Sequence, residues 1–171
     1  DEHPIGYSNI PDWVYGFEAQ FIWHGFDIGV FFRGQAHVSY DLGGDTFIPF
    51  NQGVGKGNLF EKALDRWTVD NPNPNAFYPR LSNGKSANNW QPSTRTIYDG
   101  SFLRLANMEI GYAIPKKIVQ KWGLQGLRIY FLGTNLALIS KWKLWDPETG
   151  SPNGSKYPNP RKISFGFRFT I

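Results

Sequence analysis

Histidines are the side chains of this sequence best suited to acid–base chemistry or metal binding, and their spacing argues against both. His3, His24 and His37 lie far apart, and none has a partner at the spacing of a metal site or a catalytic triad. We interpret them as a tail residue, a turn residue and a strand-end residue. The sequence therefore predicts that the chain is not an enzyme.

Two other segments have a partial likeness to ligand-binding motifs. Asp146 and Glu148, with Asn153 and Asn159, carry oxygen atoms of the kind that bind cations, but there is no EF-hand spacing, and Asp-Pro commonly starts a turn. The stretch Gly53–Gly57, GVGKG, lacks the preceding strand and the Gly-Lys-Ser/Thr ending of a phosphate-binding loop, so we expect a flexible loop. No metal and no cofactor are predicted.

Aromatic residues outside the regularly alternating segments form a third group of candidates. Aromatic rings stack on sugars or anchor a protein partner, and they also pack against one another in long loops. Three roles stay open here: loop packing, contact with a lid or a neighbouring chain, and direct contact with a substrate. The residues are Trp67, Tyr78, Trp90, Trp142, Trp145 and Tyr157.

Strands must position these residues, because apolar side chains recur at every second position through much of the chain. In the final stretch, KISFGFRFTI, the apolar residues are Ile163, Phe165, Phe167, Phe169 and Ile171. In the stretch DGSFLRLANMEIGYAIPKK, they are Ala106, Met108, Ile110, Tyr112 and Ile114, before Pro115 ends the strand. Each strand thus has one apolar face, which we interpret as a face that meets lipid.

A hairpin is predicted near the start of the chain, around His24-Gly25. Apolar residues occupy odd positions from Trp13 to Trp23 and even positions from Phe26 onward. A two-residue loop pairs the residues that flank it, so Trp23 and Phe26 lie on the same face, as the pattern requires. Each strand is long enough to cross a bilayer at a tilt, which takes about 9–11 residues.

Composition agrees with a β-rich membrane segment. Among 171 residues, 17% are aromatic, and there are 19 Gly and 12 Pro, which suits strands and turns. There is no cysteine, so disulfides and thiolate metal sites are excluded. The net charge is +4, but Lys and Arg are scattered, so nucleic-acid binding is not predicted.

Five strands are predicted, joined by connections of alternating length. They lie near residues 13–23, 26–37, 101–114, 127–138 and 162–171, with long loops over 38–100 and 139–161. The first long loop is expected to hold one helix, with Asn58 as its N-cap and Trp67 on one side. Residues 115–126 are expected to form a short basic helical turn. In outer-membrane barrels the short turns are periplasmic and the long loops are extracellular, which places the C-terminus in the periplasm.

Polar residues that alternate with the apolar face are expected to line the lumen of this barrel. A charged side chain that faced lipid at mid-depth would cost about 2–4 kcal/mol for Arg or Lys, so both arginines are placed inward. The residues predicted to line the lumen are Glu18, Gln20, Asp27, Arg33, Gln35, Glu109 and Arg168.

The succession of motifs resembles the C-terminal end of SusC/RagA-family TonB-dependent transporters, outer-membrane proteins of Bacteroidetes. It is carried by IPDWVYGFEAQFIWHGFDIGVFFRG, DRWTVDNPNPNAFYPRL, DGSFLRLANMEIGYAIPKK, GLRIYFLGTNL, LWDPETG and YPNPRKISFGFRFTI. The resemblance covers nearly the whole chain. It implies an all-β fold, namely the C-terminal five strands of a large antiparallel transmembrane barrel of about 22 strands. It also implies a plug domain in the lumen, which these residues do not include.

The resemblance implies import of oligosaccharides or peptides, without enzymatic activity. Its implied partners are the plug and the other barrel strands, a SusD-like surface lipoprotein, and the TonB complex, which acts through the missing N-terminal part. Because about eight strands are the minimum for closure, we expect the chain to be a piece of a larger protein. The alternatives are a structural or adhesive outer-membrane barrel and a soluble carbohydrate-binding β module.

Overall fold

The computed structural model describes residues 3–43, 47–51, 59–84 and 86–171. Its elements are β1 (Trp13–Trp23), β2 (Phe26–Ala36), β3 (Ser39–Asp41), η1 (Glu61–Leu64), β4 (Ile97–Asp99), β5 (Phe102–Ala113), α1 (Lys116–Val119), η2 (Gln120–Trp122), β6 (Gly126–Ser140), η3 (Pro147–Thr149) and β7 (Lys162–Thr170). No helix in the described ranges is long and apolar enough to cross a membrane.

The chain forms two compact units, which we describe separately. The sheet unit comprises Trp13–Ala36, Ser101–Lys141 and Pro158–Ile171. The loop unit comprises Asp1–Asp12, His37–Gly100 and Trp142–Tyr157.

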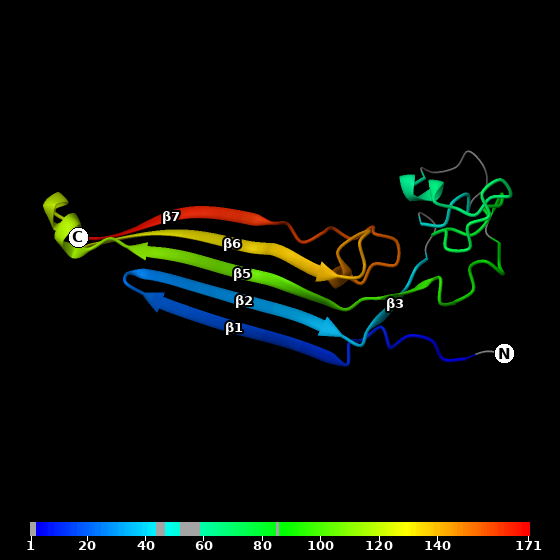
Figure 1. Cartoon of the computed structure of the whole chain (residues 1–171), viewed down its shortest axis with the longest axis horizontal. Coiled ribbons are helices and arrows are strands. Elements are labelled where there is room, and N and C mark those ends of the chain that lie inside the picture. The colour runs from blue at the N-terminus through cyan, green and yellow to red at the C-terminus, as the bar shows by residue number, and fades with distance from the viewer. Residues whose placement is uncertain (1–2, 44–46, 52–58, 85) are drawn as a thin grey trace. The chain divides into compact units, whose positions relative to one another are not determined.

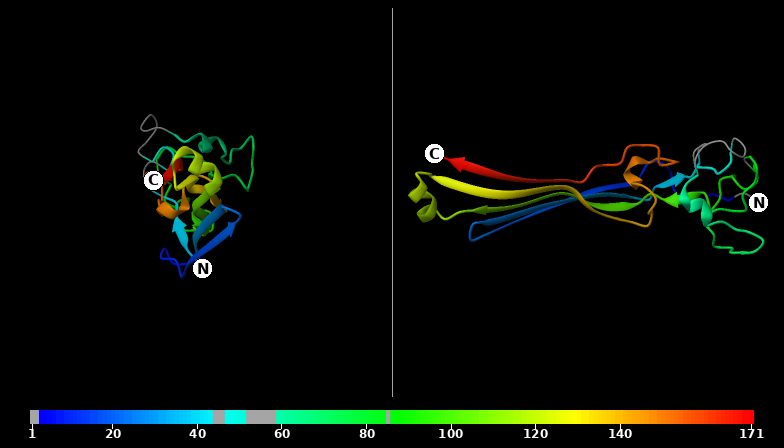
Figure 2. Two further views of the ribbon diagram at one scale, coloured as in Figure 1. Left: turned by 90° about the vertical axis from the view of Figure 1, so that its left-hand side faces the viewer. Right: turned by 90° about the horizontal axis from the view of Figure 1, so that it is seen from above.

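The sheet unit is a single layer of five antiparallel strands in the order β1-β2-β5-β6-β7 (Figures 1 and 2). Strands that are neighbours in the sheet are therefore also successive long strands of the chain. This antiparallel all-β sheet confirms the predicted fold class. Because the order is a simple meander, the short connections β1–β2 and β5–β6 emerge at one end of the sheet, and the long ones start from the other.

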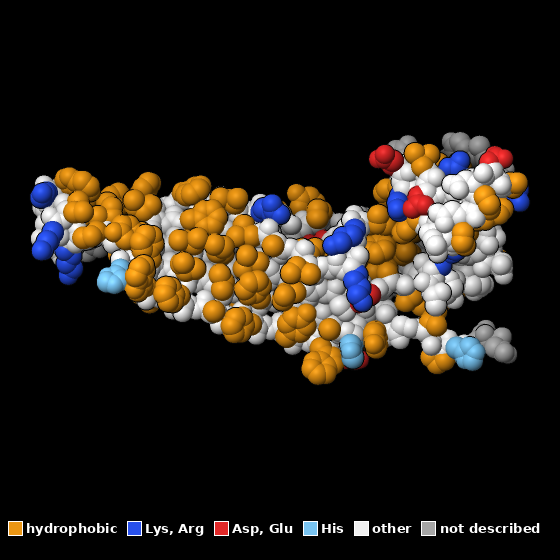
Figure 3. All heavy atoms as spheres, viewed as in Figure 1, with side chains coloured by type: hydrophobic (Ala, Val, Ile, Leu, Met, Phe, Trp, Pro, Cys, Tyr) orange, Lys and Arg blue, Asp and Glu red, His pale blue; other side chains and the backbone are white. Residues whose placement is uncertain are grey.

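The pairing register of the five strands aligns side chains of the same kind in rows that cross the whole sheet. Opposite Phe21 lie in turn Ile28, Ile110, Phe131 and Phe165, one apolar side chain from each strand. The next row is Trp23, Phe26, Tyr112, Ile129 and Phe167, which confirms the pairing predicted at the hairpin. We call this side the apolar face. Its residues are largely exposed (Phe165 by 75%), and apolar side chains cover this side of the strands in Figure 3.

The opposite side, which we call the polar face, is built from the intervening rows. One row runs Gln20, Gly29, Glu109, Leu132 and Ser164, and the adjacent row runs Ile22, Asp27, Gly111, Tyr130 and Gly166. Charged and amide side chains alternate with glycine in these rows. Long side chains on one strand can therefore lie across the bare backbone of the next.

A register shift in the middle of the sheet corrects the predicted alternation. Asn107 pairs with Thr134, but Leu105 pairs with Ala137, so β6 holds one more residue than β5 in this interval. Asn135 takes up the difference with a left-handed backbone, at φ 54°. A second shift lies between β2 and β5, where Phe31 pairs with Asn107 but Phe32 pairs with Leu105, so β5 holds one extra residue, Ala106. The prediction that placed Ala106 on the apolar face is therefore wrong. Ala106 is buried at the shift, and Leu105, opposite Phe32, continues that face.

The loop unit has its own aromatic core. Leu42, Phe47, Ala63, Tyr78 and Tyr98 are buried together, and the short strands β3 and β4 pair beside them. Residues from both long connections meet here, because the Tyr98 and Trp142 rings stack with centroids 3.9 Å apart. In addition, the Gly43 amide donates to the Pro152 carbonyl at 3.0 Å. These contacts join the two connections into a single folded body.

The helix predicted after Asn58 is wrong in extent. Asn58 lies outside the described residues, and η1 is a single 3-10 turn that follows an extended Phe60 without a side-chain cap. The helix stops because the chain turns away at Asp65, and the Trp67 amide donates to the Tyr78 carbonyl at 3.1 Å instead. By contrast, α1 and η2 form the short basic helical turn that was predicted.

Replacing Gly34 with valine is expected to lower the free energy of unfolding by about 1–3 kcal/mol, the cost of overpacking a close contact. A side chain at Gly34 would meet the Phe102 carbonyl and the Tyr15 ring, whose hydroxyl donates to that same carbonyl at 2.9 Å. The matched control is Gly29→Val on the same strand, where a side chain would meet nothing within 4 Å. Urea unfolding of the detergent-solubilised full-length protein measures both variants. Equal losses would contradict the contact.

Candidate functional site

The polar face holds the candidate site. Glu18, Gln20, Asp27, Glu109 and Arg168 all border one open hollow of about 910 Å³ on the sheet. Arg33 borders a second hollow of about 230 Å³, together with Asn107 and Thr134. Gln35 lies on the same face, opposite Val14 and Phe102. The structure thus gathers the seven sequence-predicted polar residues on one side of the sheet, and whether that side lines a lumen stays a prediction.

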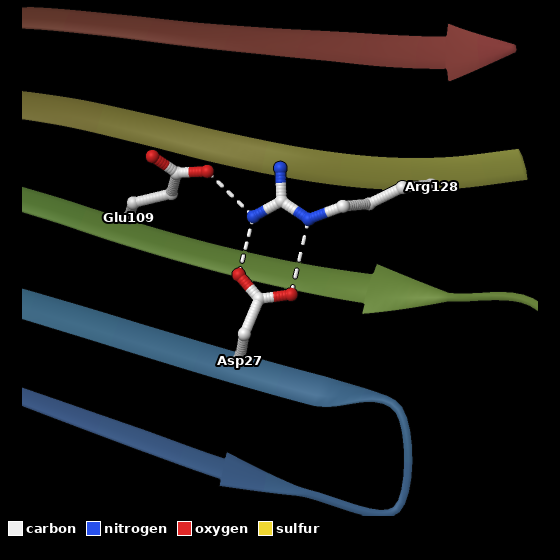
Figure 4. Close-up of polar contacts among 3 residues, drawn as sticks. All are labelled: Asp27, Glu109 and Arg128. Atoms are coloured by element: carbon white, nitrogen blue, oxygen red, sulfur yellow. Dashed lines mark hydrogen bonds and ion pairs between the residues drawn. The ribbon is translucent and has the colours of Figure 1, made fainter.

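Arg128 also borders the larger hollow, and it is not among the residues predicted from the sequence. Its Nε donates to Asp27 Oδ1 at 3.0 Å, and its terminal nitrogen contacts Asp27 Oδ2 and lies 2.5 Å from Glu109 Oε1 (Figure 4). One guanidinium thereby joins β6 to β5 and β2 through charge-assisted hydrogen bonds. The alternation along β6 could have predicted that Arg128 lies on the polar face, because Ile129 and Phe131 occupy the apolar positions of this strand.

Glycine makes this geometry possible. The Arg128 guanidinium lies directly over Gly111, at the place that any side chain on residue 111 would occupy. In the same way the Tyr130 ring lies over Gly166, and the Arg128 guanidinium is 5.2 Å from the centre of that ring. Arg128 and Tyr130 therefore lie flat along the sheet. Of the two, Arg128 borders the larger hollow.

Charge on the polar face is only partly neutralised within the sheet. Arg128 offsets both Asp27 and Glu109. In the part of the chain that the structure describes, Glu18 and Arg168 form no ion pair, and they lie on the edge strands β1 and β7. A carboxylate and a guanidinium are thus available to groups outside these five strands.

The six aromatic candidates divide into two sets. Tyr78 is only 1% exposed and its hydroxyl donates to the Phe47 carbonyl, while Trp90, Trp142 and Trp145 pack against the same core. Trp67 is half-buried, and Tyr157 is 86% exposed. Packing therefore accounts for the position of four of them. A role in contacting a substrate or a lid stays a prediction for all six.

Burial perturbs two tyrosines of the loop core. Burial raises the pKa of the Tyr98 hydroxyl to about 12, and this hydroxyl donates to the Ser151 carbonyl at 3.1 Å. Burial raises the pKa of Tyr78 as well. Both hydroxyls therefore stay protonated and act as neutral hydrogen-bond donors within the loop core. Neither is suited to general acid–base catalysis near neutral pH.

The remaining candidates have structural surroundings. His24 forms the tight hairpin turn with a left-handed backbone, and the His37 ring stacks on Tyr7 with centroids 4.5 Å apart. Asp146 accepts the Glu148 amide at 3.0 Å, as expected of an Asp-Pro turn. Among the described residues, no cluster of three His, Asp or Glu side chains could hold a metal ion. The GVGKG stretch lies outside the described residues.

A long-stranded antiparallel sheet with one exposed apolar face and one polar face is the architecture of a transmembrane β-barrel wall. TonB-dependent receptor P26 of Formosa agariphila is 32% identical over 180 residues, an alignment that covers 96% of the chain and 17% of the relative. TonB-dependent receptor P3 of the same organism is 28% identical over 169 residues, covering 91% and 16%. No family model matches the chain.

Solved structures agree with these relatives. The RagAB peptide importer in the open-open state matches with a TM-score of 0.74 and 25% identity, covering 98% of this chain and 18% of that one. A RagAB peptide transporter structure matches with a TM-score of 0.74 and 28% identity, covering 96% and 18%. The chain thus spans less than a fifth of the length of each of these proteins.

Nearly the whole chain is similar to a part of TonB-dependent receptors and of RagAB, which confirms its resemblance to the SusC/RagA family. Proteins of this class reside in the outer membrane. The relatives are named as receptors and as a peptide importer, in line with the prediction that the chain is not an enzyme.

Replacing Arg128 with methionine is expected to lower the free energy of unfolding by about 1–3 kcal/mol, because Asp27 and Glu109 lose the cation between them. Arg168→Met, on the next strand and opposite Arg128, serves as the matched control and is expected to be nearly neutral. Urea unfolding of the full-length receptor measures the difference. Adding Asp27→Asn and Glu109→Gln to the Arg128 variant should recover most of the loss. No recovery would show that packing, and not charge, explains the effect.

Proposed function

We propose that the chain forms five neighbouring strands in the barrel wall of a TonB-dependent outer-membrane importer. The observation that carries this proposal is the two-faced register, in which apolar and polar rows alternate across all five strands. Only a wall between lipid and a polar lumen requires exposed aromatic rows on one side and charged rows on the other. The likeness to TonB-dependent receptors supports the same function.

Connection length supports an orientation for this wall. One end of the sheet carries the two-residue turn His24-Gly25 and the compact turn between β5 and β6, whereas the other end gives rise to the long connections of the loop unit. Barrels of this class keep short turns in the periplasm and long loops outside. We therefore place the loop unit at the cell surface and the C-terminus in the periplasm.

The cargo that we propose is an oligosaccharide or a peptide. The proteins in the matching structures are named as a peptide importer and a peptide transporter. The polar face offers both a carboxylate, Glu18, and a guanidinium, Arg168, that have no ion pair among the described residues. Such a face suits a polar cargo and also contact with a plug domain in the lumen.

Import is tested with a strain that lacks the full-length receptor and is complemented with the intact gene. Uptake of peptide and oligosaccharide mixtures is measured by mass spectrometry of the depleted medium. The proposal predicts that deletion abolishes uptake of one of the two classes and that a protonophore does the same in the complemented strain. Unchanged uptake of both classes, together with weaker surface attachment, would favour an adhesive barrel instead.

We propose that a SusD-like surface lipoprotein covers the loop unit as a lid. The aromatic core is closed to such a partner, but η1 buries Ala63 and leaves Phe60 and Leu64 exposed, with Leu59 and Val69 nearby in sequence. Exposed apolar side chains on a compact surface favour a protein partner. These four residues therefore replace the buried aromatic residues as our preferred lid contacts.

The double variant F60D/L64D in the full-length receptor is expected to weaken lipoprotein binding roughly tenfold or more, because it places charge in an apolar contact. Copurification of the lipoprotein with the detergent-solubilised receptor provides the measurement. Ile10→Asp alters an equally exposed apolar residue of the segment before β1 and should leave copurification intact. Wild-type yields of lipoprotein from F60D/L64D would place the lid contact elsewhere.

A further inference from the structure

The turn between β5 and β6 carries a basic and apolar surface that the proposed import function does not use. Lys116, Lys117 and Lys121 are exposed, and between them Ile118 is 45% exposed and Trp122 61% exposed. The turn is a folded feature, because Val119 is fully buried and its carbonyl accepts the Leu124 amide at 3.2 Å. Its surface residues are therefore held in place at the end of the sheet.

No acidic residue occurs between Glu109 and Asp146, so the turn has no neutralising partner nearby in sequence. Within the described ranges, the three lysines form no ion pair with any carboxylate. Three cations beside an exposed indole, without counter-charges from the described residues, form a surface that attracts anions from elsewhere. Lysine is suited to mobile phosphate groups because its ammonium is a point charge on a flexible stem.

The position of the turn indicates which anions are nearby. At this end the apolar face runs through the row of Tyr112, Ile129 and Phe167 to the pair Leu127 and Phe169. The turn follows directly from β5 at the same end. Figure 3 shows Lys and Arg side chains gathered at that end of the sheet, just beyond the apolar side chains of the strands. An apolar band that ends in tryptophan and lysine is the arrangement found where a bilayer's hydrocarbon meets its headgroups.

We propose that Lys116, Lys117, Lys121 and Trp122 form a binding site for the phosphodiester headgroups of anionic phospholipids. The indole ring lies at the headgroup level, and the ammonium groups reach the phosphates around it. This inference rests on the proposed function, because it needs the sheet to span a bilayer with this turn at one leaflet. The site anchors the periplasmic end of the β5–β6 hairpin to its leaflet.

The test uses the full-length receptor in lipid nanodiscs, with Gln120 replaced by cysteine in a background without other reactive cysteines. Gln120 is exposed in the middle of the turn, so an environment-sensitive fluorophore attached there reports on the local surroundings. Emission is compared between discs of phosphatidylcholine and discs with increasing phosphatidylglycerol. Comigration of receptor and disc on size exclusion verifies insertion first. Failure to insert would overturn the membrane placement and this site together.

The expected result is a blue shift that grows with phosphatidylglycerol and is suppressed by salt. K116Q/K117Q/K121Q should need roughly tenfold more phosphatidylglycerol for the same shift, in line with the attraction of each lysine to an anionic surface. The control K141Q/K143Q/K162Q removes the same charge near the other ends of β6 and β7, and it should behave as the parent does. Identical emission in both lipids would overturn the site. A full shift with inorganic phosphate in phosphatidylcholine discs would show a site for free anions instead of lipid.

Discussion

In-register antiparallel pairing is the constraint on which the rest of this structure depends. Because side chains alternate along every strand, the pairing of Trp23 with Phe26 fixes which residues of β2 lie on the apolar face. The pairing of each further strand with its neighbour then fixes the face of its own residues. A slip of one residue would exchange the two faces. The sheet accommodates two register shifts, because β5 holds one more residue than β2 at Ala106 and β6 holds one more than β5 near Asn135, and apolar rows continue on both sides of them.

On the polar face, charged side chains from different strands neutralise one another. Arg128 lies over Gly111 and neutralises Asp27 and Glu109, so three charged residues on three strands become one local cluster. Glycine is used here because a long neighbouring side chain occupies the space of the missing one. The loop unit follows a different principle, in which Tyr98 and Trp142 join two connections that are distant in sequence through aromatic packing.

Period-two patterns were sufficient to predict an antiparallel all-β sheet, the hairpin and the face shared by the seven polar candidates. These features were predictable because the alternation of apolar and polar side chains depends only on the residues of the strand itself. The register shift was not predictable, since the extra residue depends on a left-handed Asn135 that no alternation reveals. The alternation along β6 would have been enough to place Arg128 on the polar face. Its ion pairs were not predictable in this way, because its partners Asp27 and Glu109 lie on two other strands. The burial of Tyr78 and Trp145 required contacts between segments that only the folded loop unit brings together.

Labelling of single cysteines along β7 tests the two-faced wall most directly, because the chain contains no cysteine of its own. Each position from Ile163 to Phe169 would be replaced in turn in the full-length receptor within native membranes. If the apolar face lies in lipid, a lipid-soluble maleimide will label Ile163, Phe165, Phe167 and Phe169, while a membrane-impermeant maleimide will be excluded from these four positions. Equal labelling of odd and even positions by the impermeant reagent would contradict the placement of the apolar face in lipid.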